Sequence, residues 1–304
     1  MRDNDWNFRD DQDFNEAINR RTEELYSVPD AVPDEDGVIV CPVLPLRDLV
    51  IFPHMVSPVF ISDEATLMAV ERARLKDQTV IALTQRDAEN ENPQPEDFFE
   101  IGVEMAVGRL LSMPDDSSSA LVQGRRRVEV VEFIQDEPFM LVRARPVYEV
   151  VDVDKEIDAT MRTAVEMFNK CVQLDRSLPE EAYLYALNID DPGWLSDMLI
   201  TAIAPPLADR QILLSTLDPI ERLQLVINLL VKEVDVLELE DKIHSRARSE
   251  VDRSQREFYL REQIKAIQSE LGEGDPWSRE IIELRTRIET AGLPEEVQVR
   301  AIRE

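Results

Sequence analysis

The chain has 304 residues and a formal net charge of −29, which opposes binding to the phosphates of nucleic acids and to anionic membranes. Its 43% hydrophobic content is enough for about two domains of ordinary size. It has two widely separated cysteines, no signal-peptide pattern and no run of about 18 uncharged apolar residues, which favours a cytoplasmic protein without disulfides or a membrane span.

Residues 1–36 are rich in Asp and Glu and poor in core-forming side chains, so we expect a mostly disordered acidic leader. From residue 37 to about 150, short runs rich in Val and Ile are separated by turn-forming residues, which predicts a compact all-β barrel. The apolar period is mixed, as expected if some strands bury both faces.

The basic triplet Arg125, Arg126 and Arg127 lies inside one of these strands. Strand alternation would put Arg125 and Arg127 on one face and Arg126 on the other. We interpret the triplet as part of a salt-bridged strand rather than as a phosphate site.

One helix is predicted within the β region, at about residues 63–76, with Ser62 or Asp63 as its cap and Leu67 and Val70 near one face. The acidic segment 87–100 then predicts a solvated loop. A calcium site is disfavoured there because the glycine-turned ligand spacing is absent.

The stretch PVLPLRDLVIFPHMVSPVFI, residues 42–61, combines apolar residues with several prolines. Because proline is confined to strand ends, edges and turns, the stretch predicts barrel scaffold, with His54 as a turn residue. Its candidate substrate-contact residues are Phe52, Pro53, His54 and Met55, as an exposed apolar tip. The alternative is that they pack under the inserted helix.

After residue 152 the apolar spacing becomes helical and predicts a bundle over residues 151–218, in which Trp194 anchors the core. Asp218 and Pro219 then form a strong helix start. No glycine or proline follows before Gly272, so one helix of roughly 80 Å is predicted from residue 219 to 271. Such a helix is too long for the small domain and should leave it midway, so residues 219–273 form an arm.

Apolar residues near the end of this helix form a candidate helix-packing or self-association seam. They are Phe258, Leu260, Ile264, Ile267 and Leu271. The seam is shorter than three or four heptads, so we expect weak self-association. Residues 274–304 predict the start of a helix pair with a turn at AGLPEE, and the abrupt end indicates a cut in a longer protein.

Motifs of several catalytic chemistries are missing. No glycine begins a GxxxxGKS or GxxxxGKT loop, there is no GxSxG elbow, and His54 and His244 lack neighbours at ligand spacing. We therefore expect no catalytic, metal-binding or cofactor-binding residue in this chain.

Several stretches resemble the Lon family of ATP-dependent proteases. Residues 42–61, with the helix and strands that follow, resemble the family's N-terminal domain. SQREFYLREQIKAIQSELGE, residues 254–273, resembles the segment just before the family's ATPase module. NIDDPGWLSDMLITAI and TLDPIERLQLVINLLVKEVDVLELEDKI resemble the helical region between them. The resemblance covers about residues 38–304.

The resemblance implies an α+β fold, in which a PUA-like β pseudo-barrel precedes an α-helical bundle and a long projecting helix. It implies a non-catalytic region that recognises unfolded or degron-bearing proteins and supports assembly of a hexameric protease. The AAA+ ATPase, its ATP and Mg, and the Ser-Lys dyad that degrades misfolded and short-lived regulatory proteins would lie outside this chain. Alternatives are a free-standing binding module for a small ligand or protein partner, and a coiled-coil scaffold.

Overall fold

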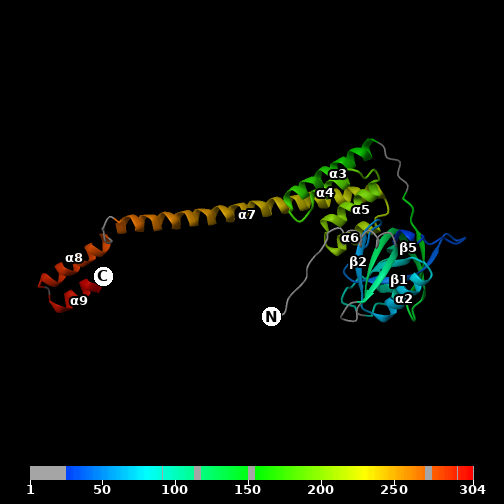
Figure 1. Cartoon of the computed structure of the whole chain (residues 1–304), viewed down its shortest axis with the longest axis horizontal. Helices are drawn as coiled ribbons and strands as arrows, with labels where there is room; N and C mark the ends of the chain where they lie inside the picture. The colour runs from blue at the N-terminus through cyan, green and yellow to red at the C-terminus, as the bar shows by residue number, and fades with distance from the viewer. Residues whose placement is uncertain are drawn as a thin grey trace, which may run out of the picture. The chain divides into compact units, whose positions relative to one another are not determined.

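The computed structural model describes residues 25–90, 92–112, 118–149, 155–270, 276–292 and 294–303 (Figure 1). The chain divides into two compact units, one ending at Leu237 and one beginning at Glu238. The first unit contains the strands and most of the helices, and the second contains helical segments.

Six strands form one mixed sheet in the described part of the first unit. They are β1 (Ile39–Leu46), β2 (Val56–Ile61), β3 (Val80–Thr84), β4 (Ile101–Ser112), β5 (Ser118–Gln135) and β6 (Leu141–Pro146). Their order is β2-β5-β4-β3-β1-β6, with β1 and β3 parallel. The long strand β5 pairs with β6 as well, so the sheet curls back on itself.

Both faces of the central strands are buried, as the mixed apolar period predicts. On β1, Leu44 and Leu46 join one hydrophobic cluster, whereas Ile39, Cys41 and Val43 join another. Every residue of β3 is buried. A strand covered on both sides reads as a continuous apolar run rather than as an alternation.

The helix predicted inside the β region is α2 (Glu64–Leu75). The side chain of Asp63 accepts a hydrogen bond from the Thr66 amide at 2.7 Å, so Asp63 is the cap. Val70 is buried and Leu67 packs partly against the same core. In the segment 87–100, residues Pro95–Asp97 form a short 3-10 helix, η1.

The expectation of a disordered leader up to residue 36 is wrong for residues 25–36. Leu25 is fully buried, and Arg125 donates hydrogen bonds to the carbonyls of Leu25 at 2.7 Å and Val28 at 3.1 Å. The buried carboxylate of Glu104 accepts from the Ala31 amide at 2.6 Å. These contacts satisfy the backbone of the segment against the sheet, while residues 1–24 lie outside the described residues.

The predicted helical region contains α3 (Lys155–Leu174), α4 (Glu180–Ala186), α5 (Pro192–Ile203) and α6 (Leu207–Ser215). On α3, Ile157, Met161, Ala164 and Phe168 repeat at three- and four-residue intervals and are buried on one face. These helices share one hydrophobic cluster with the sheet. The predicted barrel and bundle therefore lie in one compact unit.

The long helix is confirmed as α7 (Pro219–Glu270). Asp218 caps it by accepting from the Ile220 amide at 2.8 Å. Buried positions on α7 end at Val234, and Leu237 is partly buried. Residues 238–269 are exposed, so the helix leaves the core of the first unit midway, as the sequence predicts.

The second unit continues α7 and contains α8 (Pro276–Thr290) and α9 (Glu295–Arg303). A turn in which Gly292 has a φ of +61° separates the two short helices, in agreement with the predicted turn at AGLPEE. Among the described helices, none combines the length and the apolar character needed to cross a membrane.

Candidate functional site

A cluster of buried charges joins the sheet to the helices. Arg127 of β5, only 2% exposed, donates to both carboxylate oxygens of Asp197 on α5, at 2.7 and 2.6 Å. It also donates to the Leu214 carbonyl at 3.1 Å. Arg222, in the first turn of α7, pairs with Glu149 at 2.6 Å, and Glu149 also pairs with Arg127 at 3.1 Å. Two cations and two carboxylates thus balance at the junction.

The electrostatics of this cluster favour charged side chains. Burial alone would lower the pKa of Arg127, but the charges of Asp197 and Glu149 and their hydrogen bonds outweigh it, so the pKa is raised. Because its donors are used within the protein, Arg127 acts as a structural anchor. The interpretation of the arginine triplet as salt-bridged is confirmed.

The predicted alternation of the triplet is wrong. Glu104 pairs with Arg126, and the next residue of β4, Met105, pairs with Gly124, so Arg125 is an extra residue in β5. This β-bulge resets the alternation. Arg125 and Arg126 both contact the leader, through the carbonyls of residues 25, 28 and 31, and Arg127 alone faces the helices.

The sequence-predicted tip, Phe52 to Met55, is not an exposed apolar tip. Phe52 is 1% exposed and Met55 packs partly against the core. His54 is exposed, with a φ of 63°, and its amide donates to the Gly124 carbonyl at 3.0 Å, so it is the turn residue that the sequence indicates. Phe52 is excluded as a substrate contact because the core already covers its ring.

The turn borders a cavity of about 400 Å³ where the sheet meets α5. Pro53, His54 and Trp194 line it, and the ring centroids of His54 and Trp194 are 5.1 Å apart. Trp194 lies in the first turn of α5, where its amide donates to the side chain of the cap Asp191, and it packs partly against the core, as the sequence predicts. The cavity places an imidazole and an indole beside the buried charges.

A second cavity, of about 530 Å³, lies beside β2. It is lined chiefly by the end of β1 with its following loop (residues 45–49), by residues 58–63 and by the turn 136–140. Sequence reasoning missed this surface. The signal that could have found it is Pro58, because proline within a strand is typical of a sheet edge.

The predicted seam lies on the second unit. Phe258, Leu260, Ile264 and Ile267 are between 48% and 68% exposed, and Leu271 lies outside the described residues. Four apolar side chains along α7 therefore face solvent within this unit. Exposed apolar side chains of this kind are typical of surfaces that meet a partner.

The described residues offer little for metal or thiol chemistry. They contain no group of His, Cys, Asp and Glu side chains that could hold a metal ion. Both cysteines are buried, and this burial raises the pKa of Cys41 to about 12 and that of Cys171 to about 11. Thiols that hold their protons so strongly are poor nucleophiles.

Comparisons with known proteins agree with this architecture. A family model described as the ATP-dependent protease La (LON) substrate-binding domain matches residues 40–232. Over 267 residues the chain is 39% identical to Lon protease 2 of Herpetosiphon aurantiacus, and over 287 residues it is 36% identical to Lon protease of Geobacter metallireducens. The alignments cover 86% and 94% of this chain but 32% and 34% of the relatives, so the chain spans about a third of their length.

A solved structure shows the same fold. The N-terminal domain of Mycobacterium avium complex Lon protease superposes with a TM-score of 0.53 at 22% sequence identity. The match covers 63% of this chain and 98% of that domain, in agreement with the predicted α+β fold. From the sheet with its attached helices and from the family match over residues 40–232, the chain belongs to the family of Lon substrate-binding domains.

Proposed function

We propose that this chain is the substrate-recognition and assembly-supporting region of an ATP-dependent Lon-type serine protease. The observation that carries the proposal is the match of residues 40–232 to a substrate-binding domain. In this proposal the chain binds unfolded or degron-bearing proteins in the cytoplasm. The ATPase with its ATP and Mg, and the Ser-Lys protease module, belong to the rest of a hexameric enzyme.

The chemistry of the described surface supports a role in binding polypeptides. Apolar side chains are exposed on the sheet, among them Val56, Phe60 and Ile134. Exposed apolar surface is what an unfolded protein contacts, because its own apolar residues are not yet buried. The structural role of the buried arginines is compatible with a binding region that performs no chemistry.

The test is direct binding. The 304-residue chain should bind β-casein, an unfolded protein, saturably in fluorescence anisotropy and should not bind a stably folded protein of similar size. In the full-length enzyme, removal of residues 40–232 should abolish casein degradation while ATP hydrolysis persists. No saturable binding together with unchanged degradation would refute the proposal, and would favour a free-standing binding module for another ligand.

Assembly support is tested separately, at the seam. We expect weak, concentration-dependent self-association of the chain in sedimentation velocity, because four exposed apolar residues are fewer than a stable coiled coil requires. Ile264→Glu should remove it, because a charge would then have to be buried in the contact. Gln263→Glu, the neighbouring substitution to the same residue, should leave it unchanged. Equal effects of both would argue against the seam.

A further inference from the structure

Strand β2 presents a free backbone edge. Among the described residues it pairs with β5 alone. The Gly124 amide donates to the Met55 carbonyl at 2.9 Å, which sets the phase of the ladder. Hydrogen bonding alternates along an antiparallel pair, so the odd-numbered residues 57 to 61 bond to β5. The even-numbered residues 56 to 60 therefore direct their backbone groups away from it.

The proline of β2 lies at a position that agrees with this alternation of hydrogen-bonded and free residues. Pro58 has no N–H group, and it falls at a position that makes no bond to β5. The free edge therefore offers the N–H groups and the carbonyls of Val56 and Phe60. The Pro58 carbonyl accepts a hydrogen bond from the Ser57 hydroxyl at 3.3 Å, and its second lone pair remains for a peptide. An extended peptide can add to such an edge as a further strand, through main-chain hydrogen bonds.

The side chains around the edge define the kind of peptide that fits. The even-numbered side chains of β2 are apolar and lie on its outer face, where Phe60 is 68% exposed. The residues lining the adjacent cavity of about 530 Å³ include four acidic side chains, Asp48, Asp63, Asp136 and Glu137, against one basic side chain, Arg47. The surface therefore complements an extended segment that is both apolar and positively charged.

We propose that β2 binds an extended, lysine- or arginine-containing apolar segment of an unfolded polypeptide as an added strand. This inference rests on the proposed function and specifies how one part of it is carried out. A segment of about six residues matches the six residues of β2. Pro58 removes the middle donor, which limits the affinity and permits release.

Two other occupants are disfavoured by charge. A second copy of β2, with the sequence VSPVFI, has no basic residue and would bring two acidic surroundings together. Residues 1–36 of the chain are rich in Asp and Glu. Like charges in direct opposition destabilise a strand pair.

The edge is tested with one peptide and a matched pair of variants. The probe is a fluorescein-labelled nine-residue peptide in which lysine and valine alternate, titrated with the 304-residue chain. Phe60→Thr and Phe60→Pro both remove the aromatic ring, but only the proline removes the N–H group at the free edge. We expect Phe60→Pro to bind about three- to tenfold more weakly than Phe60→Thr, since one net hydrogen bond is lost.

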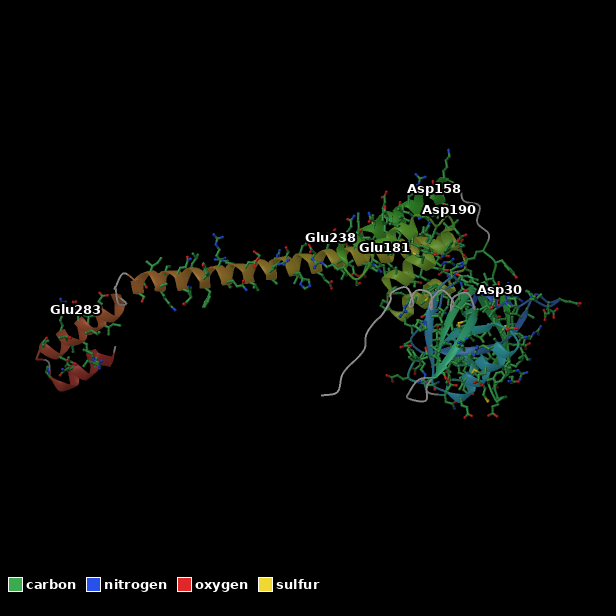
Figure 2. The ribbon with its side chains drawn as sticks, in the orientation of Figure 1. Asp30, Asp158, Glu181, Asp190, Glu238 and Glu283 are labelled. Atoms are coloured by element: carbon green, nitrogen blue, oxygen red, sulfur yellow. The ribbon has the colours of Figure 1, made fainter. Side chains whose placement is uncertain are left out.

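The charge contribution is tested at Asp136. Asp136→Lys should weaken binding of the lysine peptide about threefold or more. The control is Asp190→Lys, which makes the same change at an exposed aspartate just before α5 (Figure 2). It should leave the affinity within about twofold. A peptide with glutamate in place of lysine should bind weakly to the unsubstituted chain.

The outcomes separate the two proposals. Equal affinities of the Phe60→Thr and Phe60→Pro variants, both folded by circular dichroism, would overturn strand addition while casein binding kept the proposed function intact. Loss of self-association in Phe60→Pro would instead assign the edge to a contact between copies. If the unsubstituted chain bound no unfolded polypeptide, the proposed function itself would fail. Should the proline at 60 prevent folding, Val56→Pro against Val56→Thr makes the same comparison.

Discussion

At the scale of single residues, the junction of sheet and helices depends on two arginines that the helices and the sheet share. Arg127 and Arg222 are both essentially inaccessible to solvent, and each contacts Asp197 and Glu149. Neither carboxylate would be stable at such a place without its guanidinium partners, because an isolated buried charge loses its hydration. The junction therefore behaves as one unit of four charges.

Removing one of these four charged side chains should lower the free energy of unfolding. We expect Arg127→Met to lower the free energy of unfolding by about 3 kcal/mol or more, because the buried carboxylate of Asp197 loses its bidentate partner. Urea denaturation followed by tryptophan fluorescence measures this. The control is Arg145→Met, since the exposed pair of Arg145 with Glu129 should contribute less than about 1 kcal/mol. Similar losses in both variants would contradict the assignment.

The two thiols give a residue-scale prediction with a pH dependence. Burial raises the pKa of Cys41 to about 12 and that of Cys171 to about 11. At pH 8 the folded chain should react with a thiol reagent far more slowly than the urea-unfolded chain. Between the ordinary thiol pKa and these raised values, the thiols of the folded chain keep their protons and those of the unfolded chain lose them. The contribution of the two thiols to the free energy of unfolding is therefore fully present below the ordinary thiol pKa of about 8.5, and it is lost as the pH rises toward 12. Rapid labelling of both cysteines without denaturant would contradict this.

At the scale of elements, the sequence predicts helices better than it predicts which surfaces meet. The starts of α2 and α7 follow from Asp63 and Asp218, whose capping chemistry is local. The burial of Phe52 and the ordering of residues 25–36 depend on partners far away in the chain, such as Arg125. The bulge at Arg125 is equally invisible, because nothing in the local residue pattern marks an extra residue.

The ordered part of the leader should contribute to stability. We expect Leu25→Ala to cost about 2–4 kcal/mol of unfolding free energy, because the side chain is fully buried against the sheet. Tyr26→Ala, next to it and mostly exposed, should cost less than about 0.5 kcal/mol. Chemical denaturation of both variants makes the comparison. If Leu25→Ala matched its neighbour, the segment would not be part of the folded unit.

At the scale of the whole molecule, burial divides the chain more sharply than secondary structure does. Helix α7 passes from the first unit to the second without interruption. One face of the helix is buried up to Val234, whereas residues 238–269 are all exposed. A helix without a buried face depends on its own local hydrogen bonds, so it opens more easily than one that packs on a core.

Limited proteolysis should reveal this division. We expect trypsin to cut first between residues 242 and 256, where Arg246, Arg248 and Arg253 are exposed on α7. A stable fragment containing the first unit should accumulate and be identified by mass spectrometry. Arg222, on the same helix but fully buried, should resist cleavage at the same protease concentration. Early cutting at Arg222, or uniform resistance along α7, would contradict this expectation.

The extra residue at Arg125 changes which residues of β5, odd- or even-numbered, face the helices. Before it, the even-numbered residues Ala120 and Val122 belong to the hydrophobic cluster shared with the helices. After it, Val128 and Val130 belong to the other cluster, while Arg127 turns toward the helices. Deleting this one residue would leave Glu104 paired with Arg126 and keep the later side chains on their present faces, whereas inserting or deleting a residue in the regular part of the strand would move every side chain beyond it to the opposite face.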